Sequence, residues 1–251
     1  MHHHAHRKRG AAAEHPRVLA VEHKTFDAGF FQQVARHPHL HRIDAGEDFD
    51  KFGLIDVGKV TEGDKVVVSG AAGATGSTVG QIARIKGAAR VIGLAGSDDK
   101  CAWLVDELGF DAAVNYKTEN VAARLREACP GGINLFFDNV GGELLDICLA
   151  RLALRGRVVL CGAISSYNDR GSIAGPSNYR NLIPRRGRME GFIILDYLDR
   201  FPAAQAEMAQ WVAAGKVKFA VHIVDGLEHA PDALNLLFTG GNTGKVIVRV
   251  E

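Results

Sequence analysis

The sequence lacks the features that mark membrane-spanning, secreted and nucleic-acid-binding proteins. No apolar run reaches the roughly 18 residues that a spanning helix needs, and no secretory leader is visible. The formal net charge is only +1, and charges of both signs lie along the chain without interleaved aromatic residues or an obvious basic face. We therefore expect a globular protein of the cytoplasm, with no membrane and no nucleic acid among its partners.

Cysteine is also scarce, with four widely spaced residues that suggest neither a disulfide framework nor a zinc cluster. We expect buried thiols and no metal site. Cys101 is the exception to consider, because a first-turn helix position beside Lys100 would lower its pKa and make it reactive.

Histidine, in contrast, is concentrated at the amino terminus. Nine of the eleven histidines fall within residues 1–50, a segment without a sustained period of 2 or 3.6. Two interpretations stay open: a metal-binding tail, or a tag-like or mispredicted terminus with no packed role. The nine are His2, His3, His4, His6, His15, His23, His37, His39 and His41.

One stretch, residues 65–85 (KVVVSGAAGATGSTVGQIARI), combines a buried strand, a glycine turn and the start of a helix. The β-branched run Val66–Val68 is typical of a parallel strand that is buried on both faces. Apolar residues recur at helical spacing over residues 77–85. Between the two lie three glycines that would allow a phosphate to approach the backbone, namely Gly70, Gly73 and Gly76. The stretch predicts a dinucleotide-binding turn, with Ala71 in place of the usual first glycine.

Strand and helix patterns alternate behind this turn at intervals of about 20 to 25 residues, which predicts an α/β fold with a doubly wound parallel (Rossmann) sheet over residues 51–218. The expected strands are 88–95, 112–115, 133–138, 156–161 and, as the sixth, 191–197, and the expected helices are 98–108, 121–129, 143–152 and 202–214.

Three further predicted elements lie outside this doubly wound sheet: a strand at 219–224, a helix at 230–238 and a strand at 245–250. We therefore expect three parts: an irregular histidine-rich segment at 1–50, the Rossmann domain at 51–218, and a C-terminal segment at 219–251.

Seven ordered motifs from about residue 52 onward resemble those of the zinc-independent medium-chain dehydrogenase/reductases, in the NADPH-dependent prostaglandin, alkenal and curcumin reductase branch. They are SGAAGATGS, GLAGSDDKC, LGFDAAVNYK, FFDNVGG, VVLCGAISSYN, MEGFIILDY and GNTGKVIVRV. The first fifty residues do not take part in the resemblance.

The resemblance implies a set of cofactor-binding residues at the strand ends. The parts of the cofactor concerned are the pyrophosphate, the 2′-phosphate, the nicotinamide ribose and the nicotinamide ring. Phe192 and Ile193 would contact the carboxamide through their backbone, and Asn242 matches a C-terminal asparagine that reaches back to the cofactor. The other residues of the set are Gly73, Ala74, Thr75, Gly76, Ser97, Lys100, Tyr116, Asn139, Cys161, Gly162, Ala163, Ile164 and Ser165.

The residues favour NADP over NAD. An NAD site normally carries an acidic side chain at the end of the second strand, and here the residues near 95–97 are small and uncharged. Lys100, in the first turn of the next helix, would oppose the helix dipole unless an anion lay nearby, and the 2′-phosphate is such an anion. The alternative that Asp98 serves a ribose stays open.

The family chemistry implies hydride transfer from NADPH to the β-carbon of an enone or enal. Tyr167 is the residue we expect to donate to the developing oxyanion. Relatives carry a barrel-like first domain of over a hundred residues, to which the C-terminal segment returns, and the 50 residues here do not match it. We thus expect residues 245–250 to lack strand partners. The alternative function is a truncated, catalytically impaired NADP-binding module. We also expect a homodimer formed through the sixth strand.

Overall fold

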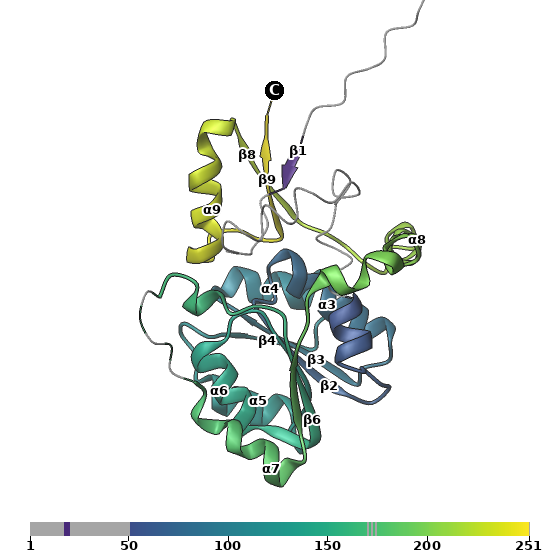
Figure 1. Cartoon of the computed structure of the whole chain (residues 1–251), viewed down its shortest axis with the longest axis vertical. Coiled ribbons are helices and arrows are strands. Elements are labelled where there is room, and N and C mark those ends of the chain that lie inside the picture. Colours follow the sequence, from purple (N-terminus) through teal and green to yellow (C-terminus); the bar gives the residue numbers. More distant parts are fainter. Residues whose placement is uncertain (1–17, 21–50, 170, 172, 174, 251) are drawn as a thin grey trace, which may run out of the picture.

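The computed structural model describes residues 18–20, 51–169, 171, 173 and 175–250, with the backbone alone at 18–20. Its strands form a six-stranded sheet and a three-stranded sheet, which lie apart from one another in Figure 1. The predicted histidine-rich segment lies outside the described residues, apart from the strand β1 (Val18–Ala20).

The six-stranded sheet is parallel throughout and has the order β4-β3-β2-β5-β6-β7. In chain order this is third, second, first, fourth, fifth and sixth, the doubly wound Rossmann arrangement. The predicted fold class is therefore confirmed. The strands are β2 (Lys65–Ser69), β3 (Arg90–Ala95), β4 (Ala112–Asn115), β5 (Ile133–Asp138), β6 (Leu152–Leu160) and β7 (Arg188–Gly191).

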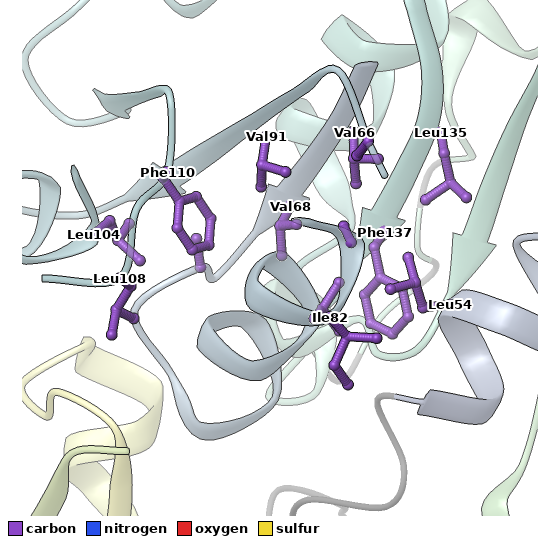
Figure 2. Close-up of a cluster of buried hydrophobic side chains, with 14 of the residues drawn as sticks. Leu54, Val66, Val68, Ile82, Val91, Leu104, Leu108, Phe110, Leu135 and Phe137 are labelled. Carbon is purple, nitrogen blue, oxygen red and sulfur yellow. The ribbon is translucent and has the colours of Figure 1, made fainter. Parts of the chain in front are cut away.

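Helices cover both faces of this sheet. On one face, α3 (Ala74–Ile85) and α4 (Asp98–Asp106) pack with the π-helical turn η2 (Phe52–Val57) and α8 (Phe201–Ala213). Figure 2 shows part of this cluster, including Val66 and Val68 of β2, Leu135 and Phe137 of β5 and Ile82 of α3. On the other face, α5 (Val121–Ala128) and α6 (Gly142–Ala150) bury the second cluster. Burial on both faces explains the continuous apolar strand sequences.

Helix α3 begins at Ala74, three residues before the predicted start at Ser77. Its first turn, Ala-Thr-Gly, has no apolar periodicity, so the pattern alone could not include it. The glycine turn therefore runs directly into the helix.

The predicted sixth strand at 191–197 is wrong in its bounds. The strand β7 ends at Gly191, and Ile194–Arg200 forms the 3-10 helix η5. Ile194, Tyr197 and Phe201 recur at a helical spacing and pack around Phe52, with the Tyr197 ring centroid 4.7 Å from that of Phe52. This packing decides the conformation over the strand propensity of the apolar run.

The three-stranded sheet has the order β1-β9-β8, in which β9 (Lys245–Arg249) is parallel to β8 (Val221–Asp225) and antiparallel to β1. The expectation that residues 245–250 lack partners is thus wrong, because β9 is the central strand. Helix α9 (Ala230–Thr239) packs on this sheet through Ala233 and Leu237. The three-part division at residues 50 and 218 stays a prediction.

The segment between β6 and β7 contains short helices: η3 (Ile164–Ser166), η4 (Ser177–Asn181) and α7 (Leu182–Arg185). A further 3-10 turn, η6 (Leu227–His229), precedes α9. Among the described residues, no helix has the length and hydropathy needed to cross a membrane.

Candidate functional site

A cavity of about 800 Å³ lies where the carboxyl ends of β2, β3, β5 and β6 meet the segment that joins α9 to β9. Thirteen of the seventeen predicted site residues line it: Gly73, Ala74, Thr75, Gly76, Lys100, Tyr116, Asn139, Cys161, Gly162, Ile164, Ser165, Tyr167 and Asn242. Ligands bind at this edge of open α/β sheets. The sequence thus placed most of the candidate residues around one cavity.

The glycine turn forms one wall of the cavity. The Gly73 N–H donates to the Gly70 carbonyl at 3.0 Å, which closes the turn. A Cβ at Gly76 would lie 2.4 Å from the Gly70 oxygen, so only glycine fits there. The N-cap residue of α3, Gly73, has no side chain that could cap the helix, and the first turn of α3 holds no acidic residue. The first-turn amides and the positive end of the helix dipole are therefore available to an anion.

Lys100 supplies a cation at the same cavity. Its Nζ donates to the Gly240 carbonyl at 2.6 Å, which ties α4 to the end of α9. Burial lowers the pKa of Lys100, and the nearby charge of Lys117 lowers it further. A bound anion would oppose this lowering of the pKa, because an opposite charge favours the protonated amine.

Tyr116 and Lys117 lie beside Gly96, at the carboxyl end of β3, and we call this part of the site the Gly96 corner. A Cβ at Gly96 would lie 2.7 Å from the Tyr116 hydroxyl oxygen and 3.2 Å from Cε of Lys117. Burial raises the pKa of Tyr116, so the phenol keeps its proton near neutral pH. The corner offers hydrogen-bond donors and positive charge.

Ser97 and Asp98 have other tasks. The Ser97 Oγ accepts from the Lys100 backbone N–H at 3.4 Å as the N-cap of α4. The Asp98 Oδ1 accepts from Nδ2 of Asn115 at 2.7 Å, and neither residue lines the cavity. The end of β3 presents Ala95 and Gly96 to the cavity instead.

Asn139 is held by a buried network that joins the ends of β2 and β5. The Ser69 hydroxyl donates to Oδ1 of Asp138 at 2.7 Å and accepts from the Asn139 N–H at 2.8 Å. Asp138 also accepts from the N–H groups of Val140 and Gly141, at 3.0 Å each. Burial raises the pKa of Asp138, although these hydrogen bonds oppose the shift. The network fixes the turn that carries Asn139.

Tyr167 lies at the cavity with its hydroxyl oxygen accepting from the Ala163 N–H at 3.0 Å. Ala163 itself is not a lining residue, and it instead orients the phenol. An oxygen that accepts from a backbone amide still has its own proton to donate.

Phe192 and Ile193 are predicted cofactor contacts that do not line the cavity. Phe192 packs its ring 6.4 Å from that of Phe137, at an angle of 64°, and lies over Gly53. The core therefore takes up the Phe192 side chain, and the expected contact of the backbone of these two residues with the cofactor stays a prediction.

Several lining residues were not predicted. They come from the start of α5, from α6 and from the α9–β9 segment: Glu119, Asn120, Val121, Ala122, Glu143, Leu144, Ile147, Leu237, Phe238, Gly240, Gly244, Lys245 and Val246, among others. Residues 119–122 and 143–147 follow strands that end at the carboxyl edge of the six-stranded sheet, and this position could have predicted that they line the site. The residues from 237 onward belong to α9, to β9 and to the segment between them, and no local pattern could place them at the cavity.

No disulfide joins the four cysteines, all of which lie within the described residues. Burial raises the pKa of Cys101, with further contributions from Glu119 and Asp98, so the predicted lowering by Lys100 is wrong. Burial likewise raises the pKa of Cys129 to about 11. The Cys101 and Cys129 thiols therefore stay protonated near neutral pH.

Among the described residues, no group of three or more His, Cys, Asp or Glu side chains is placed so that it could hold a metal ion.

Comparison with known proteins identifies the family. The family model for "Zinc-binding dehydrogenase" matches residues 74–213, more than half of the chain. The chain is 49% identical over 203 residues to the putative NADP-dependent oxidoreductase YfmJ of Bacillus subtilis, covering 80% of this chain and 60% of the relative. It is 41% identical over 204 residues to the NADPH-dependent curcumin reductase of Escherichia coli, covering 79% and 59%.

The structure of CurA from Vibrio vulnificus in complex with NADPH matches with a TM-score of 0.78 at 40% identity, covering 86% of this chain and 67% of that chain. The present chain spans about 60% of the length of the curated relatives it matches. These matches bear out the resemblance inferred from the seven motifs, and the chain belongs to the zinc-binding dehydrogenase family, in the branch that includes these reductases.

Proposed function

We propose that this chain is an NADP-dependent oxidoreductase that reduces the activated carbon–carbon double bond of an enone or enal. The observation that carries the proposal is the cavity in which the uncapped start of α3 and the Lys100 amine both face the same space. Two relatives named for NADP or NADPH, and one solved complex with NADPH, support this choice of cofactor.

The residues fit a dinucleotide phosphate group. The pyrophosphate would lie on the amides of Ala74 to Gly76, where the start of α3 has neither a side-chain cap nor an acidic residue to compete with it. The 2′-phosphate would lie between Lys100 and Tyr116, beside the small residues Ala95 and Gly96. This corner holds no carboxylate from Asp98, which is engaged by Asn115.

When bound, the nicotinamide would supply the hydride. The chain would orient the ring between the ends of β5 and β6, where Asn139, Cys161, Gly162, Ile164 and Ser165 line the cavity. Tyr167 would donate its phenolic proton to the oxyanion that develops on the substrate carbonyl. The Ala163 amide holds the phenol in place for that task.

The remaining expectations are proposals of the same kind. The substrate is a small molecule, and the protein acts in the cytoplasm. A homodimer would form through the sixth strand, now bounded at Arg188–Gly191, which is the last strand in the sheet order and pairs with β6 on one side.

The test is turnover by the purified full chain with NADPH and a panel of enones and enals, followed at the nicotinamide absorbance band. Loss of absorbance that depends on enone supports the proposal. NADPH binding without any turnover would instead identify the impaired NADP-binding module that the sequence also allowed.

A further inference from the structure

The expected even mixture of charges is wrong for one stretch. Residues 151–188 carry eight arginines, no lysine and a single acidic residue, Asp169, which gives a formal charge of +7 in a chain whose net charge is +1. Arginine carries a planar fork of donors that matches carboxylates, whereas lysine is a point charge. An excess made of arginine alone indicates recognition of carboxylate or phosphate groups.

The fold brings two identical tripeptides from this stretch together. Arg155-Gly156-Arg157 lies on β6 and Arg186-Gly187-Arg188 leads into β7, with Arg157 and Arg188 as register partners. A Cβ at Gly187 would lie 2.9 Å from the Gly156 carbonyl oxygen, so the two backbones touch at their glycines. The four arginines therefore flank a single point on the amino-terminal edge of the sheet.

Two of these four arginines, Arg157 and Arg188, bind other parts of the protein. Arg157 binds the Asp64 carboxylate and donates to the Lys59 carbonyl at 3.1 Å. Arg188 donates to the Val57 carbonyl, and its nearest carboxylate, on Glu190, is 3.8 Å away. These two side chains contribute to the attachment of the segment after η2.

The other two arginines of the tripeptides, Arg155 and Arg186, and the neighbouring Arg185 have no such partners among the described residues. Arg155, Arg185 and Arg186 are exposed, and none of them has an ion pair or side-chain hydrogen bond within the described residues. Arg155 and Arg186 also hold left-handed backbone, with φ of 58° and 49°. Bulky side chains rarely occupy this region, and such residues concentrate at sites of function.

Two exposed apolar side chains complete this area. Leu154 is 53% exposed and Ile183 is 78% exposed. We call Leu154, Arg155, Ile183, Arg185 and Arg186 the arginine surface. Leu182 of α7 lies against Gly187, which brings Ile183 and the two arginines after it beside β6. Figure 1 shows α7 at the opposite end of the molecule from α9, so the surface is remote from the cavity.

We propose that the arginine surface binds an acidic segment of another protein, in which carboxylates alternate with apolar side chains. Charge complementarity carries the choice of partner. A second copy docked face to face would set arginines against arginines. Leu154 and Ile183 favour a protein segment over a nucleic acid, because they need apolar side chains as partners. The proposal does not depend on the proposed function.

The test measures fluorescence anisotropy of a labelled 15-residue peptide of Glu-Glu-Leu repeats with the full chain at low salt. We expect R155Q/R185Q/R186Q to weaken binding about tenfold or more, since unpaired arginines supply the attraction. The matched control, R126Q/K216Q/K218Q, removes three exposed cations elsewhere and should change binding less than about twofold.

L154S/I183S should weaken the Glu-Glu-Leu peptide but not a polyglutamate of equal length. Equal thermal melting of the variants verifies their folding, and the single variant R185Q, at an ordinary backbone position, replaces the triple variant if that one unfolds. Absence of peptide binding, equal loss in the control variant, or tighter arginine-dependent binding of single-stranded DNA of equal charge would each overturn the proposal.

Discussion

Lys100 is the residue on which the choice of cofactor depends. Lys100→Ala should weaken NADPH far more than NADH, because a lost charge-assisted contact to a phosphate costs about 1.5 to 3 kcal/mol, roughly tenfold to a hundredfold in affinity. Fluorescence titration of both cofactors measures this, and NADH is the internal control for any loosening of the contact with Gly240. Equal losses for the two cofactors would contradict the assignment.

Tyr167 tests the proposed chemistry. Tyr167→Phe keeps the ring but removes the proton that the oxyanion would receive, and loss of one such donor lowers kcat by about 10² to 10³. The dissociation constant of NADPH should be nearly unchanged. Stopped-flow or steady-state turnover with an enone decides the matter. Undiminished kcat in this variant would mean that the hydroxyl serves only to bind the Ala163 amide.

The raised pKa of Asp138 predicts that the stability of the protein depends on pH. Burial raises its pKa in the folded protein, so the folded state holds this proton more tightly than the unfolded state does. Its contribution to the free energy of unfolding should therefore rise as the pH falls from the raised pKa toward the ordinary value, by at most about 1.4 kcal/mol per pH unit.

Urea unfolding of wild type and Asp138→Asn at pH 7 and at pH 4 isolates this term, because the two proteins share all other carboxylates and pH 4 lies near the ordinary pKa of an aspartate. Wild type should gain stability relative to the variant on acidification. The exposed substitution Asp199→Asn is the control and should follow wild type. Parallel curves for wild type and Asp138→Asn would refute the prediction.

At the scale of elements, the packing of α3 on the segment after α4 rests on one glycine. A Cβ at Gly80 would lie 2.0 Å from Cζ of Phe110, a ring that is only 3% exposed and has no space to move aside. Gly80→Ala should lower the free energy of unfolding by about 1 to 3 kcal/mol. The gain in helix propensity, about 0.5 to 1 kcal/mol, is too small to offset this overlap.

Thermal or urea unfolding measures the loss. Gly191→Ala is the matched control, because its Cβ would meet nothing nearer than 3.9 Å and the change should stay within about 0.5 kcal/mol. A Gly80→Ala protein as stable as wild type would show that α3 can shift away from Phe110.

Elements whose sequence and packing agree were predictable. Val66–Val68 and Leu135–Phe137 are apolar because helices cover both faces of the sheet, so their local pattern reports their final place. The run from Phe192 to Tyr197 was not predictable, since its conformation depends on Phe52, about 140 residues earlier. The same holds for the Lys100 contact with Gly240, which no spacing encodes.

At the scale of the molecule, hydrogen bonds join the two sheets around the cavity. The Gly244 N–H donates to the Ala72 carbonyl at 2.8 Å, and Gln81 Nε2 donates to the Lys218 carbonyl at 3.0 Å. The Gly244 and Lys100 contacts hold the α9–β9 segment over the glycine turn, whereas the Gln81 contact attaches the segment that leads into β8. The cavity is therefore formed jointly by both sheets within the described residues.

The central claim is that this cavity binds NADPH. Titration of the purified full chain with NADPH, followed by nicotinamide fluorescence, tests it most directly. The account predicts saturable binding at one site per chain, tighter for NADPH than for NADH by at least about tenfold. No saturable binding, or equal affinity for the two cofactors, would contradict it.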